Sequence, residues 1–305
     1  MRMLAVVVVA FGIGLGALST ELPHSGPFST GTFEFRLADS ARNRWVEIIL
    51  VAPRGEGAFP FVLFSPGFLL SGSAYRSTGE LLASHGIAVA LLTYDVNLFT
   101  ADHRVLAQDL RFVLDQLPGA AEAHGVALDR ERVGLVGHSL GGKLSFLAAA
   151  EEPSVRAVAG LDPVDGGAPG TDDPVRFPRA ADRMEAIPVP KLLIGAERGG
   201  ETQFGIPCAP REENYERLYE RARPPAWEMT QLGAGHMDYL DNPNCGFACA
   251  VCVPGSDPGR ARLAAQTYLV LFLRAHLLGD VEAGNDLVAR LASDTATGRV
   301  RVQTK

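Results

Sequence analysis

The sequence has little positive charge and no sign of a modular construction. Only 28 Lys and Arg residues stand against 35 Asp and Glu residues, so the net charge is −7 and the pI is near 5.5. Nucleic-acid-binding proteins present a basic face to the phosphates, and this balance argues against such a partner. The 305 residues contain no internal repeat and no linker that would divide them. A single large domain is therefore expected.

Long hydrophobic runs are also scarce, and the one exception is at the N-terminus. Arg2 precedes an uncharged run over residues 4–18, with small residues at Ala17 and Ser19. The run is short for a membrane helix, which needs about 20 apolar residues. It has the parts of a secretory signal. We predict a signal peptide over residues 1–19 and a secreted or periplasmic mature protein without a stable membrane span. A membrane anchor formed by the uncleaved segment is the alternative.

Cysteines are few, and all of them lie in the last third of the chain: Cys208, Cys245, Cys249 and Cys252. An even number in an oxidising compartment indicates disulfides, here two, and the sequence does not choose among the three pairings. A zinc site is the rival interpretation, but the C-x3-C-x2-C spacing lacks the paired C-x2-C knuckles of most such sites. Disulfides are the prediction.

The rest of the chain alternates strand patterns with helix patterns. Strand-like runs lie at residues 32–38, 44–53, 59–65, 87–95, 132–137, 155–162, 189–197 and 226–233, and helical patterns at 74–86, 102–117, 142–152 and 260–278. This order predicts a mostly parallel sheet with helices on both faces, in one α/β domain over residues 20–280. Residues 281–305 are set apart as a C-terminal tail containing a short strand. Two long loops, 163–187 and 198–226, follow strand ends, where α/β sheets bind ligands.

A serine among glycines points to the chemistry. The stretch "GLVGHSLGGK" fits G-x-S-x-G, the nucleophile elbow, in which Ser139 sits on a sharp strand-to-helix turn. His236, in "LGAGHMDYLD", follows the last strand of the domain, where the base falls in the α/β-hydrolase order Ser…Asp/Glu…His. His138 adjoins the serine, but strand alternation directs its side chain elsewhere. The order predicts the α/β-hydrolase fold, with Ser139 as nucleophile and His236 as base.

The acid that orients His236 should end a strand between the elbow and the base. Asp162, in "GLDPVDG", ends the strand after the elbow helix, whereas Glu197 ends the following strand, which is the commoner position in this fold. Asp165 is a third candidate. We favour Asp162, with Glu197 and Asp165 as alternatives.

The oxyanion hole of this fold combines the amide after the nucleophile with one from the loop after an early strand. These are Leu140 and, in "SPGFLLSG", Phe68. Leu69 and Met237 are expected to line an apolar substrate pocket. Such a site needs no metal and no other cofactor.

These segments together resemble chlorophyllase and its relatives among the α/β-hydrolases. The resemblance covers roughly residues 45–278 and is carried by "VLFSPGFLLSGSAYRSTGELLASHGIAV", "GHSLGGK", "GLDPVDG", "PCAP", "ENYERLYE" and "GHMDYLD", in family order. It implies a serine esterase in which Ser139 matches the nucleophile, His236 the base and the "DPVDG" segment the acid, which strengthens Asp162. Plant chlorophyllases usually carry Arg after the nucleophile, and this chain carries Leu140, as many lipases do.

The expected function is therefore a secreted serine carboxylic-ester hydrolase that forms an acyl-enzyme from small-molecule or lipid-like apolar esters. Chlorophyll, cleaved to chlorophyllide and phytol, is one candidate substrate. The alternatives are a polyester hydrolase or lipase and an esterase like the platelet-activating-factor acetylhydrolases. Two other classes stay open: an acyltransferase with the same triad, and a binding protein on the same scaffold.

Overall fold

The computed structural model describes residues 25–96, 101–167 and 173–305, so the predicted signal segment lies outside it. Within these ranges the strands are β1 (Thr30–Asp39), β2 (Arg44–Pro53), β3 (Phe59–Ser65), β4 (Ala88–Tyr94), β5 (Leu128–His138), β6 (Val155–Leu161), β7 (Lys191–Ala196), β8 (Ala226–Gln231) and β9 (Val300–Thr304). The α-helices are α1 (Arg76–Ser84), α2 (His103–Glu122), α3 (Leu140–Ala149), α4 (Tyr215–Arg221), α5 (Phe247–Ala250), α6 (Pro258–Leu277) and α7 (Val281–Ala296). None of the helices in this part of the chain is both long and apolar enough to span a bilayer.

All nine strands of the described chain join one sheet, in the order β1-β2-β4-β3-β5-β6-β7-β8-β9. The six strands from β3 to β8 pair in parallel, while β1 and β2 at one edge and β9 at the other are antiparallel. Central parallel strands are covered on both faces, which explains the continuous apolar runs in β3 and β7. The predicted α/β-hydrolase fold is confirmed.

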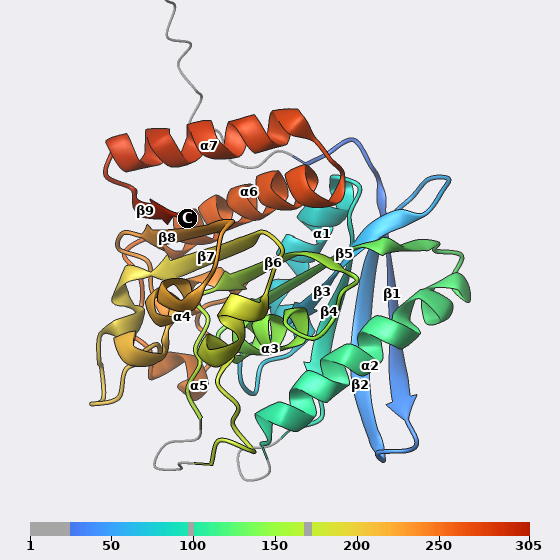
Figure 1. Ribbon diagram of the computed structural model, residues 1–305, viewed down its shortest axis with the longest axis horizontal. Helices are drawn as coiled ribbons and strands as arrows, with labels where there is room; N and C mark the ends of the chain where they lie inside the picture. Colours follow the sequence, from blue (N-terminus) through green and yellow to red (C-terminus); the bar gives the residue numbers. More distant parts are fainter. Residues whose placement is uncertain (1–24, 97–100, 168–172) are drawn as a thin grey trace, which may run out of the picture.

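Helices cover both faces of the sheet (Figure 1). On one face α2, α3 and α4 pack over a core that includes Leu110, Leu144 and Leu218. On the other, α1 and α6 pack over a second core that includes Leu82 and Leu269. Every residue of α3 is buried, because this helix crosses the middle of the sheet directly after the elbow.

Residues 281–305, set apart as a tail on sequence grounds, form α7 and β9. The side chain of Asp280 accepts the Ala283 N–H and caps α7, and Ala283, Leu287 and Leu291, spaced four apart, form its buried face. α7 lies against α6, and β9 pairs with β8 as the last strand of the sheet (Figure 1). The C-terminal segment is thus built into the same α/β unit.

The carboxyl ends of β3, β5, β6 and β8 lie along one edge of the sheet, since these strands run in the same direction. The loops that leave them carry Phe68, Ser139, Asp162 and His236. Parallel topology therefore gathers side chains from four distant parts of the sequence at this edge.

Candidate active site

Ser139 occupies the one-residue turn between β5 and α3. Its backbone has φ 53° and ψ −121°, a left-handed conformation that is costly for a residue with a side chain. The turn is tight enough to exclude side chains on both flanks. A Cβ on Gly141 would lie 2.0 Å from the Ser65 carbonyl oxygen, and one on Gly137 would lie 2.2 Å from the Gly141 backbone. The elbow glycines are therefore required by close backbone approach.

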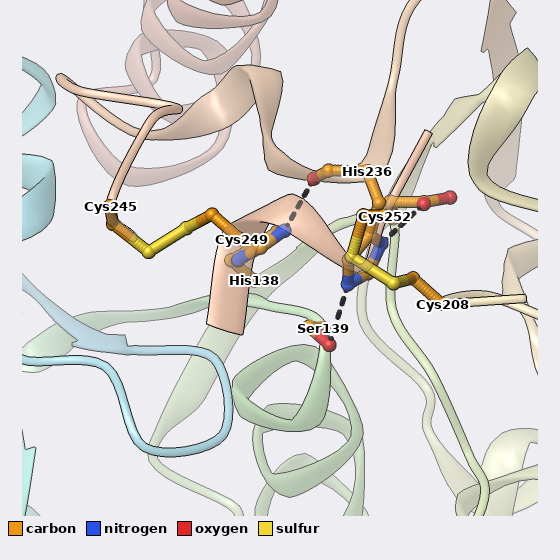
Figure 2. The surroundings of a disulfide bond; sticks show 8 residues. His138, Ser139, Cys208, His236, Cys245, Cys249 and Cys252 are labelled. Atoms are coloured by element: carbon orange, nitrogen blue, oxygen red, sulfur yellow. Dashed lines mark hydrogen bonds and ion pairs between the residues drawn. A yellow bond between two sulfur atoms is a disulfide. The ribbon is translucent and has the colours of Figure 1, made fainter. Parts of the chain in front are cut away.

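The structure brings Ser139, His236 and Asp162 together in one line of hydrogen bonds. The distance from Ser139 Oγ to His236 Nε2 is 2.9 Å, and from His236 Nδ1 to Asp162 Oδ2 it is 2.7 Å (Figure 2). Asp162 is fully buried, and its other oxygen accepts the Ala196 N–H at 3.0 Å. A carboxylate can only accept, so the imidazole proton belongs on Nδ1 and Nε2 is left to accept the serine proton.

Left-handed backbone is concentrated at this site. In the described ranges four non-glycine residues have φ in that region, and three of them are Leu69 at 58°, Ser139 at 53° and Asp162 at 40°. Such conformations persist only where the surrounding structure enforces them, and they cluster at functional sites.

The two alternative acids bind other partners. Glu197 accepts hydrogen bonds from Arg301 and the Gly233 N–H, and the guanidinium lowers the pKa of this carboxyl. Asp165 accepts the Ala180 and Ala181 N–H groups. The structure brings neither carboxylate to His236.

The oxyanion-hole candidates lie on either side of the serine. A Cβ on Gly67 would be 3.5 Å from the Ser139 Cβ, so the loop that carries Phe68 is next to the nucleophile. Leu140 is the first residue of α3, where amides have no partner within the helix. Among the described residues no acceptor is recorded for the Phe68 or the Leu140 N–H.

The two residues predicted to line the substrate pocket differ in exposure. Leu69 is 48% exposed beside Phe68, whereas Met237 is only 8% exposed. Met237 lines a cavity of about 420 Å³ together with Cys249, Cys252 and Val253. Leu69 is thus accessible at the sheet edge, and Met237 faces the segment that follows the base.

His138 has a role that the sequence did not reveal. Its side chain is fully buried and bonds through Nε2 to the backbone oxygen of His236 at 2.8 Å, and the two rings are 4.8 Å apart. Burial holds the pKa of His138 well below its usual range. The imidazole is therefore neutral, and its Nε2–H donates to the backbone carbonyl of His236. Strand alternation correctly separates His138 from the serine hydroxyl, but it carries no information about this contact.

The four cysteines form two disulfides, as predicted, with the pairs Cys208–Cys252 and Cys245–Cys249. Cys252 lines the same cavity as Met237, the residue after His236. The segment after Cys252 packs on the loop of the base, because a Cβ on Gly235 would be 2.5 Å from both the Gly255 nitrogen and the Val253 oxygen. This disulfide therefore anchors the segment on which the loop of His236 packs. In the described part of the chain no group of three or more His, Cys, Asp or Glu side chains is arranged to hold a metal ion.

Removing Cys208–Cys252 should destabilise the protein more than removing Cys245–Cys249. The cysteines are 44 residues apart in the first pair and 4 in the second. Chain-entropy arguments give about 4 and about 2 kcal/mol, respectively. The Cys208→Ser/Cys252→Ser double variant should also lose kcat, because the support of the base loosens, whereas Cys245→Ser/Cys249→Ser serves as the matched control. Thermal melts and steady-state kinetics measure both effects. Equal losses of melting temperature and kcat in the two variants would show that Cys208–Cys252 has no special part in supporting the loop of His236.

Comparison with known proteins shows the family of this chain and its fold. The chlorophyllase family model matches residues 18–300. Chlorophyllase-1, chloroplastic, of Citrus sinensis is 31% identical over 77% of this chain and 74% of its own length. Cutinase est2 of Thermobifida alba is 29% identical over 57% of this chain and 52% of its own. The solved structure of a ferulic acid esterase from Streptomyces cinnamoneus has a TM-score of 0.62 and 23% identity, covering 83% of this chain and 91% of that one, and shows the shared fold.

Proposed function

Since the chain belongs to the chlorophyllase family and is a carboxylic ester hydrolase, we propose that Ser139, His236 and Asp162 carry out its reaction through an acyl-enzyme. The observation that carries this proposal is the unbroken contact from the Asp162 carboxylate through the imidazole to the serine hydroxyl. The proposed nucleophile and base are 97 residues apart in sequence, so only the fold brings them together. Ser139 lies on a sharp strand-to-helix turn, which leaves its hydroxyl accessible to substrate.

In the proposed mechanism His236 Nε2 takes the proton of Ser139 as Oγ attacks the ester carbonyl carbon. The oxyanion accepts hydrogen bonds from the Phe68 and Leu140 amides, and such donors are worth about 3–4 kcal/mol each in the transition state. His236 then protonates the leaving alcohol, and the acyl group stays on Oγ. Water, deprotonated by the same nitrogen, attacks the acyl carbon. The bond from that carbon to Oγ then breaks, Oγ takes the proton back from Nε2, and the acid is released. Throughout, Asp162 accepts the Nδ1–H and stabilises the imidazolium.

We propose esters with a large apolar group as the substrate class. Leu69 next to the oxyanion loop is half exposed, and Phe204 and Ile206, in the loop tied down by Cys208, are 69% and 68% exposed. Relatives named as chlorophyllases and cutinases make chlorophyll and aliphatic or aromatic polyesters the substrates to test first. Leu140 stands where plant chlorophyllases usually carry an arginine, and this difference favours testing polyesters beside chlorophyll.

The test of this function combines hydrolysis with covalent trapping. The full chain is incubated with chlorophyll, a polyester and a medium-chain ester, and the products are analysed by mass spectrometry with and without an added alcohol acceptor. A fluorophosphonate should add one phosphonyl group, located on Ser139, and abolish hydrolysis in proportion to labelling. Ser145→Ala, in helix α3 directly after the turn of Ser139, should label like the wild type.

An active enzyme labelled elsewhere, or not at all, would contradict the proposal, and ester transfer to the alcohol without release of acid would identify an acyltransferase.

We further propose export, which is supported by two disulfides and by the composition of residues 1–19. The intact mass in the labelling experiment tests this too, because a processed chain would lack those residues.

A further inference from the structure

Tyr75 and His138 form a buried polar bridge between the two loops of the site. Tyr75, the last residue of the short 3-10 helix Gly72–Tyr75, places its hydroxyl 2.8 Å from His138 Nδ1 and 3.1 Å from the Gly67 nitrogen. His138 Nε2 bonds to the His236 backbone oxygen at 2.8 Å. Both side chains are 0% exposed. The bridge thus runs from the loop after β3 to the loop after β8, and the proposed reaction does not use either side chain.

The direction of each hydrogen bond follows from the available protons. The His236 carbonyl can only accept, so the neutral His138 ring carries its proton on Nε2 and must accept at Nδ1. Tyr75 O–H therefore donates to Nδ1, while its oxygen accepts the Gly67 N–H. Burial lowers the pKa of His138 and raises that of Tyr75, so neither group changes its proton in the ordinary working range. The bridge has a single arrangement of donors and acceptors.

At one end the bridge holds the Pro66–Gly67 peptide, which directly precedes the Gly67–Phe68 peptide of the proposed oxyanion donor. Tyr75 holds the Gly67 nitrogen, and the Leu70 N–H bonds to the Gly67 oxygen at 3.0 Å. In a trans peptide the C=O of Gly67 and the N–H of Phe68 point in opposite directions in one plane. The Leu70 N–H, by holding the Gly67 carbonyl, sets the direction of the Phe68 N–H, and Tyr75 fixes the other side of Gly67 through its nitrogen. The fit is close, because a Cβ on Gly67 would lie 3.1 Å from His138 Nδ1.

At the other end the bridge holds the backbone of the base. The His236 carbonyl accepts a hydrogen bond from the side chain of His138, the residue directly before the nucleophile. The base and the nucleophile are therefore both positioned by the same end of β5. A general base and its oxyanion donors act in one transition state, and errors of about 1 Å between such groups cost about a hundredfold in rate.

Resting on the proposed function, we infer that Tyr75 and His138 are positioning residues that hold the Phe68 amide and the His236 imidazole in register for the reaction at Ser139. Neither touches the substrate. The two loops follow strands β3 and β8, which lie on opposite sides of β5 in the sheet, so the loops are not neighbours along the chain. The hydrogen bonds of Tyr75 and His138 link them instead.

Tyr75→Phe tests the bridge at the oxyanion end. Removing an oxyanion donor lowers kcat by about 10²–10³-fold, so displacing one should lower kcat by about tenfold. KM for a small ester should stay within about twofold. The ratio of kcat/KM for an ester to that for the matching thionoester should also fall, because the sulfur anion accepts weaker hydrogen bonds and a misaligned amide no longer favours oxygen. A merely structural role would leave this ratio unchanged.

The matched control is Tyr268→Phe, which removes the hydroxyl of another fully buried tyrosine that donates to Asp294 from helix α6. It should lose stability without changing kcat or the thionoester ratio. At the base end, His138→Gln keeps an N–H donor for the His236 carbonyl and should retain far more kcat than His138→Leu, which has none.

The outcomes separate the two proposals. A wild-type chain that is not labelled at Ser139 would overturn the proposed function and this inference with it. A labelled, active wild type would overturn only the positioning role in either of two cases: if Tyr75→Phe behaves like Tyr268→Phe, or if His138→Gln and His138→Leu are equally active.

Discussion

Replacing Ser139 with alanine is expected to lower kcat for ester hydrolysis by about a millionfold. The hydroxyl oxygen is the only atom of the site that the proposed mechanism bonds to the substrate carbon. Without it His236 can at best direct a water molecule, and the Phe68 and Leu140 amides still bind the oxyanion. A residual acceleration of about 10³–10⁴-fold over the uncatalysed reaction is therefore expected. Steady-state and single-turnover kinetics with a medium-chain ester measure the loss.

The folded protein should tolerate this substitution. The Ser139 side chain is only partly buried, and its recorded hydrogen bond is the one to His236, whereas its backbone makes the contacts of the elbow. The melting temperature should stay close to that of the wild type. Ser145→Ala, in helix α3 directly after the turn of Ser139, should keep its kcat. A Ser139→Ala variant that retains more than about a thousandth of the wild-type kcat would show that another group is the nucleophile.

The meeting of Ser139 and His236 at one sheet edge was predictable from sequence, because the elbow motif and the order of the strands both carry signals. The elbow needs glycines at two positions for backbone approach, so Ser139 sits in a recognisable motif. His236 follows the last parallel strand, and the order of strands along the chain fixes which loops meet at the sheet edge. The parallel α/β architecture followed from the alternation of apolar strands and helices in the same way. The roles of these residues stay predictions for the experiments above.

The remaining features depend on contacts between distant segments, which carry no local signal. Tyr75 lies 63 residues from His138, and nothing in "SGSAYRS" distinguishes a tyrosine that bonds a buried imidazole from an ordinary core tyrosine. The cysteine pairing required the positions of loops separated by 44 residues. Helix α7 did have a weak signal in the spacing of Ala283, Leu287 and Leu291 after the capping Asp280, but its buried face is only one residue wide.

The choice of acid shows the same limit. Asp162 and Glu197 both follow neighbouring parallel strands, and their positions in the chain suit either one. The left-handed backbone of Asp162 and the guanidinium of Arg301 on Glu197 distinguish them, and both are properties of the folded chain. The sequence could therefore rank these carboxylates but could not decide between them.

Asp162→Asn is expected to lower kcat by about ten-thousandfold while leaving the fold intact. Asp162 Oδ1 accepts the Ala196 N–H, and the asparagine oxygen should take over this contact. Its NH₂ group then faces His236 Nδ1, which must accept a hydrogen bond. The imidazole proton consequently moves to Nε2, the atom that has to accept the proton of Ser139. The variant thus has a correctly placed base in the wrong tautomer. Steady-state kinetics, with a thermal melt to check folding, measure the effect.

Glu197→Gln and Asp165→Asn are the matched controls, since each neutralises one of the other carboxylates considered for the role. Glu197→Gln should stay within about tenfold of the wild-type kcat, because Glu197 reaches the base loop only through the Gly233 N–H. Asp165→Asn should act mainly on stability, since its two oxygens accept the Ala180 and Ala181 amides away from His236. The opposite result would be a ten-thousandfold loss of kcat in Glu197→Gln and a small loss in Asp162→Asn. The acid would then be Glu197, and the 2.7 Å contact between Asp162 and His236 would not be the catalytic one.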